Sequence, residues 1–97
     1  MTIDIIKKTA YGLNNLLRLK IMKILSSGPK TANEVFIELK GYKSIYRQSV
    51  HRALELLREC DLILKVYDPI SKRLEYSLKY QKIIINLVDM KINSHPT

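Results

Sequence analysis

The chain has 97 residues, 46% of them hydrophobic and 27% charged, and its 17 Lys and Arg against 9 Asp and Glu give a net charge of +8. This length allows one small domain with a single hydrophobic core. No segment reaches the roughly 18 consecutive apolar residues that a membrane span needs, and the start MTIDIIKKTA lacks the features of a secretion signal, so we expect a cytoplasmic protein. The excess of cations favours a polyanionic partner, with nucleic acid ahead of a membrane surface or an acidic protein.

Two helices are predicted before the first Gly-Pro pair. The first covers 3–13, with Thr2 placed to cap it. Its apolar side consists of Ile3, Ile6 and Ala10. Asn15 is placed to cap a second helix over 16–27, which ends at Gly28-Pro29. This helix has one apolar side with Leu17, Ile21, Ile24 and Leu25 and another with Leu19 and Met22. Two apolar sides are typical of a central helix or of one shared with a second subunit.

Two further helices are predicted in the middle of the chain. The spacing Thr31-Ala-Asn-Glu34 is that of a capping box, which predicts a helix over 32–40 that Gly41 ends. After a turn, a fourth helix covers 47–60. Its apolar stripe consists of Val50, Ala53, Leu54, Leu57 and Cys60. The polar residues left pointing outward near its first turns are Arg47, Gln48, His51 and Arg52.

The hydrophobic period changes from 3.6 to 2 after the fourth helix. Residues 62–67 are rich in strand formers, residues 73–78 alternate apolar and polar side chains, and the turn-forming segment 68–72 joins them. These features predict a β-hairpin. A last helix is predicted over 80–92, followed by a loose end. Its apolar residues are Ile83, Ile84, Leu87, Val88 and Met90.

The predicted order of elements, α-α-α-α-β-β-α, is that of a winged helix-turn-helix, a mainly α fold with a small β-hairpin. Over Leu13–Leu78 the sequence resembles the ArsR-like family of small dimeric transcriptional regulators. LNNLLRLKIMKILSSGP resembles the family's opening signature, through Arg18, Ile21 and Leu25. TANEVFIEL is similar to its support helix, and QSVHRALELLREC with the following DLI is similar to its recognition helix and exit.

Two departures from the family pattern keep neighbouring families open. Asp61 stands at the position where the ArsR-like pattern has Gly, and the turn from Lys40 to Tyr46 is longer by several residues. PadR-like and MarR-like winged helices are therefore alternatives. All of these families imply DNA binding by one domain, here 1–97.

A recognition helix fits the major groove, which is about 12 Å wide and shows a distinct pattern for each base pair. We expect Arg47 and Arg52 to donate to guanine and Gln48 to pair with adenine, while cations of the hairpin meet flanking phosphates or the minor groove. The expected DNA-binding residues are Lys43, Tyr46, Arg47, Gln48, Ser49, His51, Arg52, Lys65, Lys72 and Arg73.

Each of these residues also has a plainer interpretation. His51 is equally well a neutral surface histidine, and Lys72 and Arg73 would simply keep a hairpin soluble. Arg58, beside Glu55 and Glu59, is expected to form a surface ion pair with i,i+3 spacing.

The sequence gives little reason to expect a cofactor, a metal or catalysis. Cys60 lies on the apolar stripe and is expected to be a small buried hydrophobic residue. A metal bound by Asp89 and His95 across a dimer is a weak alternative. No nucleophile has a base near it in sequence, and there is no Gly-rich phosphate loop, so we expect no enzymatic activity.

Homodimerisation would bury apolar residues that a small monomer leaves exposed. The expected interface, on the terminal helices 3–13 and 80–92 and on the second helix, consists of Ile3, Ile6, Leu19, Met22, Ile83, Ile84, Leu87 and Val88. The alternative is that the last helix folds back over its own core. Two recognition helices about 34 Å apart would read an inverted repeat in double-stranded DNA. The sequence thus predicts a dimeric repressor; the rival hypothesis is a winged-helix scaffold for protein interactions, and a single-strand or RNA binder is less favoured.

Overall fold

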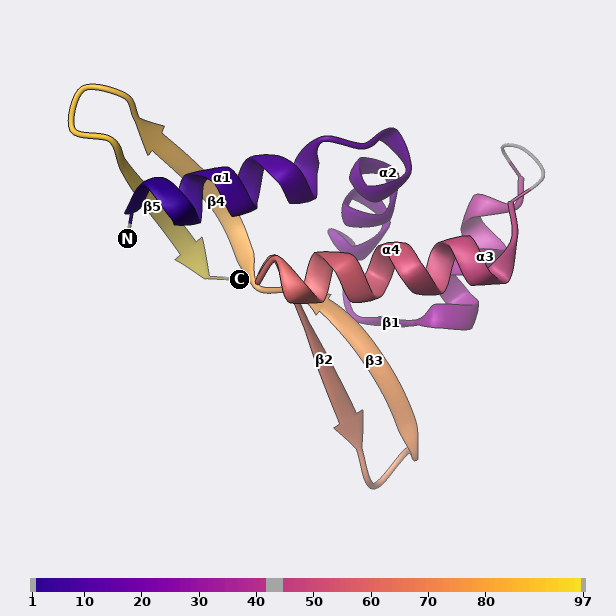
Figure 1. Cartoon of the computed structure of the whole chain (residues 1–97). Helices are drawn as coiled ribbons and strands as arrows, with labels where there is room; N and C mark the ends of the chain where they lie inside the picture. Colours follow the sequence, from indigo (N-terminus) through magenta and orange to yellow (C-terminus); the bar gives the residue numbers. More distant parts are fainter. Residues whose placement is uncertain (1, 42–44, 97) are drawn as a thin grey trace.

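The computed structural model describes residues 2–41 and 45–96, and four helices and two antiparallel sheets are found among them (Figure 1). The helices are α1 (Thr2–Leu13), α2 (Leu16–Leu25), α3 (Ala32–Leu39) and α4 (Arg47–Glu59). The strands are β1 (Lys30–Thr31), β2 (Ile63–Asp68), β3 (Arg73–Leu78), β4 (Tyr80–Asn86) and β5 (Lys91–Pro96). The four predicted helices of the first 60 residues are therefore confirmed, with ends that shift by at most two residues.

Side chains cap two of the helices as the sequence predicts. The side chain of Asn15 accepts a hydrogen bond from the backbone N–H of Arg18 at 3.1 Å, which starts α2. At α3 the capping box is complete, because Thr31 Oγ1 accepts from the N–H of Glu34 at 3.1 Å while the N–H of Thr31 donates to Glu34 Oε1 at 2.9 Å. These bonds satisfy backbone donors that a helix start leaves without partners.

Helix α4 runs through the middle of the molecule (Figure 1). The predicted stripe is its buried face, since Val50, Leu54 and Leu57 are at most 1% exposed. Residues from both preceding helices and from the first sheet complete the core; they are Ile21, Leu25, Val35, Leu39, Leu62, Ile63 and Tyr76. Cys60 is 7% exposed within this cluster, as expected of a small buried hydrophobic residue.

Strands β2 and β3 form the predicted hairpin, in register from Ile63 opposite Leu78 to Asp68 opposite Arg73. Short strand β1 pairs with β3 on its other side, which gives the strand order β1-β3-β2. A two-residue strand carries no periodicity, so the sequence did not predict β1. With α3 and α4 in front of it, this hairpin makes the chain a winged helix-turn-helix, and we call β2 and β3 with their turn the wing.

The predicted C-terminal helix over 80–92 is wrong: these residues form most of a second hairpin, β4–β5, that leaves the molecule in a different direction from the wing (Figure 1). Ile83, Ile84 and Ile85 are consecutive β-branched residues, which lose side-chain freedom in a helix and fit a strand. Asn86 then makes the turn, because its side-chain oxygen accepts from the N–H groups of Val88 and Asp89 at 3.1 Å each. The apolar spacing matched a helix by coincidence, and the fold has less helix than expected.

The chain leaves α4 through Asp61, whose φ of 63° lies in the left-handed region. Gly adopts this conformation most easily, but Asp tolerates it better than most residues. The carboxylate of Asp61 also accepts a hydrogen bond from Lys79 Nζ at 2.7 Å, between the wing and β4. The departure from the ArsR-like glycine therefore preserves the same backbone turn.

Helix α1 packs through small residues rather than through its predicted apolar side. Ile3 is 48% exposed and Ala10 is exposed, whereas Thr9 is buried and Gly12 faces the interior. A Cβ atom on Gly12 would lie 2.6 Å from Leu62 Cδ1 and 3.1 Å from the Cβ of Cys60. Only glycine lets α1 approach the junction of α4 and β2 this closely.

We therefore predict that Gly12→Ala destabilises the protein by about 1 to 3 kcal/mol, because the added methyl group overpacks this junction and outweighs the better helix propensity of alanine. Urea unfolding followed by circular dichroism measures the change. The control is Gly41→Ala, where a Cβ meets no atom within 4 Å. Equal stabilities of the two variants would contradict the packing described for α1.

Candidate nucleic-acid interface

The N-terminal half of α4 presents an unbroken polar surface. Its opposite face is anchored in the core, so the outward side chains are held on a rigid element. The residues exposed there are Tyr46, Arg47, Gln48, Ser49, His51 and Arg52. Among the described residues, no hydrogen bond or ion pair is found for the side chains of Gln48, His51 or Arg52, which leaves their polar groups available to a ligand. Lys43, predicted to contact the DNA backbone, lies in 42–44, outside the described residues.

Arg47 lies against α3 rather than extending into solvent. Its Nη1 donates to Asn33 Oδ1 at 2.7 Å, and its guanidinium carbon sits 4.3 Å from the centre of the Phe36 ring. A cavity of about 210 Å³ separates α3 from α4 at this point, with Arg47 and His51 in its wall. The hydrogen bond and the cation–π contact orient Arg47, and they make Asn33 part of the surface, a residue that sequence reasoning missed.

The three wing cations of the predicted site differ in their surroundings. Arg73 forms an ion pair with Glu34 of α3 and another with Glu75 at 3.4 Å. Lys65 pairs with Glu55 of α4 at 3.3 Å. Lys72 at the turn is exposed, and no partner for it is found in residues 2–41 and 45–96. Of the three, Lys72 is the cation most available to an external phosphate.

Glu55 joins the recognition helix to both strands of the wing. Its Oε1 accepts from Arg58 Nη2 at 2.9 Å, which confirms the predicted i,i+3 pair. Its Oε2 accepts from the Tyr76 hydroxyl at 2.8 Å and from Lys65 Nζ at 3.3 Å. We call these four residues the Glu55 cluster. The sequence pointed only to Arg58, although a strand tyrosine that faces the core usually needs a polar partner.

Ionisation of Glu55 is strongly favoured in the fold. The hydrogen bond from Arg58, followed by those from Tyr76 and Lys65, lowers the pKa of Glu55 to about 2 against the opposing effect of burial. Burial and the bond to Glu55 raise the pKa of Tyr76 to about 12. The cluster is therefore a carboxylate held by two cations and a neutral hydroxyl at neutral pH.

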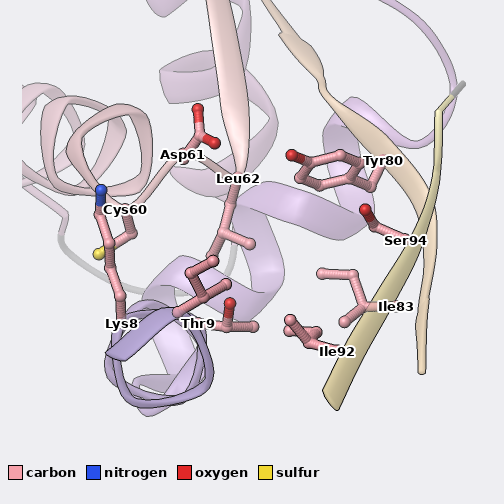
Figure 2. A pocket seen from close by; sticks show the side chains of 10 residues that line it. Lys8, Thr9, Cys60, Asp61, Leu62, Tyr80, Ile83, Ile92 and Ser94 are labelled. Carbon is pink, nitrogen blue, oxygen red and sulfur yellow. The ribbon is translucent and has the colours of Figure 1, made fainter. Parts of the chain in front are cut away.

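A second cavity, of about 240 Å³, lies between α1, the C-terminal end of α4 and the β4–β5 hairpin (Figure 2). Ile83 and Ile92 face Thr9 of α1 across it, and the ring of Tyr80 extends toward Leu62 (Figure 2). The cavity is at the other end of α4 from Arg47. It is therefore separate from the polar surface described above.

The residues predicted to form a dimer interface fall into two groups. Met22 and Ile83 pack against the core of their own chain, and Ile6 is half-buried. The others are exposed, by 41% to 93%; they are Ile3, Leu19, Ile84, Leu87 and Val88. The alternative in which the C-terminal segment covers its own core is thus met in part, by the inward face of a hairpin instead of a helix.

Neither a metal cluster nor a membrane span is found in the part of the chain that the structure describes. No three His, Cys, Asp or Glu residues there lie close enough together to hold an ion. No helix there is both long enough and apolar enough to cross a bilayer.

No family model and no curated protein matches the sequence. Among solved structures, the fold is similar to that of a protein described as a MarR-family transcriptional regulator from Enterococcus faecalis V583, with a TM-score of 0.60 and 20% identity. The match covers 75% of this chain and 64% of the other chain, so this chain spans less than two thirds of that protein. The likeness supports the winged-helix fold, one of the architectures that the long turn before α4 had left open.

The lowered pKa of Glu55 predicts an acid-dependent loss of stability. The folded-state pKa of about 2 lies below the ordinary value of 4.5, so ionised Glu55 stabilises the fold fully above pH 4.5 and loses this effect as the pH falls toward 2. Glu55→Gln should lower the thermal unfolding temperature at pH 7, and its difference from the wild type should shrink below pH 4.5. Glu59→Gln, on the same helix, is the control. A difference that stays constant with pH would contradict the assignment.

Proposed function

We propose that this protein is a sequence-specific, double-stranded DNA-binding regulator of transcription. In this proposal α4 is the recognition helix, which enters the major groove with its N-terminal half, while the wing meets flanking DNA. The protein acts as a cytoplasmic homodimer and represses transcription by occupying its operator. The ArsR-like resemblance remains a prediction within this broader class.

One observation carries the proposal: a helix fully buried on one face exposes consecutive polar side chains on its other face, beside a basic hairpin. Gln48 and Arg52 offer the donors and acceptors that read adenine and guanine edges, and no partner within the described chain competes for them. The net charge of +8 supports a polyanionic ligand. The winged-helix likeness to a protein described as a transcriptional regulator supports the same conclusion.

Selection of bound duplexes from a random pool at moderate salt tests the proposal. Recovery of an inverted repeat with half-sites about one helical turn apart is the expected result. Recovery of no preferred sequence would contradict it and favour the protein-interaction scaffold.

Base contacts and phosphate contacts should respond differently to mutation. Arg52→Ala is expected to weaken binding to the selected duplex by about 1 to 3 kcal/mol and to relax preference at one base position. Lys72→Ala should weaken binding to all duplexes and reduce the slope of log affinity against log salt by about one. Fluorescence anisotropy across a salt series measures both effects.

Lys23→Ala, which removes one exposed positive charge from α2, is the matched control for these two variants. It should leave base preference unchanged. Arg52→Ala with unaltered base preference would remove Arg52 from the set of base-reading residues.

Exposed apolar residues of α1 and of the β4–β5 hairpin support homodimerisation. Val88 is 93% exposed at the hairpin turn, next to Leu87 at 75%. Surface of this kind is unusual on a protein without a partner. In the proposed dimer a second copy covers it.

Val88→Asp should weaken dimerisation by at least about tenfold, because a charge placed in an apolar contact must be desolvated. Size-exclusion chromatography with light scattering over a concentration series measures the change. Ile70→Asp is the control, since Ile70 is also 93% exposed but lies at the turn of the wing. A monomeric wild type, or equal effects of both substitutions, would contradict this interface.

A further inference from the structure

The wing needs a fixed orientation if it is to meet DNA together with α4. Strands β2 and β3 extend away from the core as a hairpin, and their outer side chains Val66, Tyr67 and Leu74 are 43% to 56% exposed. An isolated two-stranded hairpin is only marginally stable in water. Packing beyond the first rungs therefore does little to set the direction of the wing.

The Glu55 cluster makes its contacts where the wing leaves the core. Lys65 and Tyr76 face each other across the two strands, and Glu55 Oε2 accepts a hydrogen bond from each of them. One oxygen of a helix side chain thus holds both strands at a single rung. The last rung, Asp68 opposite Arg73, lies three residues further out, about 10 Å at 3.3 Å per residue, so a small rotation at the inner rung becomes a larger displacement of Lys72.

The position of Glu55 along α4 connects this rung with the base-reading surface. Arg52 precedes it by three residues on the same rigid helix, and Arg58 follows it by three and bonds to its other oxygen. A second ion pair, from Arg73 to Glu34 of α3, links the wing with the other helix of the helix-turn-helix. Lys65 and Arg73 therefore hold the wing to these helices.

We propose that Glu55 is a positioning residue, which fixes the angle between α4 and the wing so that both reach one duplex at the same time. This inference rests on the proposed DNA-binding function. It assigns to an acidic residue a favourable part in binding a polyanion. Lys65 acts through Glu55 in this arrangement, and Lys72 makes the contact with the backbone.

The sign of the effect on DNA affinity separates positioning from simple electrostatics. Glu55→Gln and Glu59→Gln each remove one negative charge from α4, so electrostatics alone would strengthen phosphate binding in both variants. If Glu55 positions the wing, Glu55→Gln instead binds the selected duplex about tenfold more weakly. Its salt slope also falls by about one for each phosphate contact that the wing loses. Glu59→Gln should bind as tightly as the wild type or more tightly.

Glu55→Gln that binds as tightly as Glu59→Gln with the wild-type salt slope would overturn the proposal. Circular dichroism at the assay temperature establishes that each variant is folded. If Glu55→Gln does not fold, Tyr76→Phe replaces it, because phenylalanine keeps the buried ring and removes only the hydroxyl that bonds to Glu55. The expected direction is the same, with a smaller loss of affinity.

A measurement without DNA tests the orientation of the wing independently. Spin labels on Ser49 and Ser71, both exposed, report the distance between α4 and the wing turn in a Cys60→Ala background. We expect a narrow distance distribution in the parent and in Glu59→Gln, and a broad one in Glu55→Gln. Unchanged distributions would overturn the positioning role even if the protein binds DNA, whereas a failed duplex selection with a broadened distribution would reject only the function proposed for the domain.

Discussion

Burial of one face of α4 is the constraint on which the rest of the structure depends. Val50, Leu54 and Leu57 leave almost no surface to solvent, and α2, α3 and the first sheet all complete their cores against them. Such burial contributes about 1.5 to 3 kcal/mol for each large aliphatic side chain. The same anchoring gives the opposite face its order, because polar side chains on a fixed helix keep a constant spacing. Packing and recognition are two consequences of one amphipathic pattern.

The elements that the sequence predicted correctly are those with local physical signals. Capping by Asn15 and Thr31, the stripe of α4 and the alternation of β3 each involve neighbours in the chain, so they are readable without the fold. The β4–β5 hairpin was mistaken for a helix because its isoleucines suit both periods. The β propensity of three consecutive β-branched residues and the turn made by Asn86 were the stronger signals.

The candidate site divides in the same way. Exposure of Gln48, His51 and Arg52 follows from the helical period, and the sequence was sufficient for it. The contacts of Arg47 with Asn33 and of Glu55 with Tyr76 join residues 14 and 21 positions apart, and no local pattern encodes them. Charge counting treated all cations of the surface as equivalent. Carboxylates of the fold itself distinguish Lys65, which they neutralise, from Lys72.

The close contact at Gly12 has a mechanical consequence. No side chain separates α1 from the junction of α4 and β2, and Arg18 of α2 holds the end of α1 by donating to the carbonyls of Gly12 and Tyr11 at 2.8 and 2.9 Å. Flexible side chains usually cushion small movements between helices, and here that cushion is missing. The first helix therefore behaves as a lever: any tilt imposed on its outer end is passed on to the base of the recognition helix.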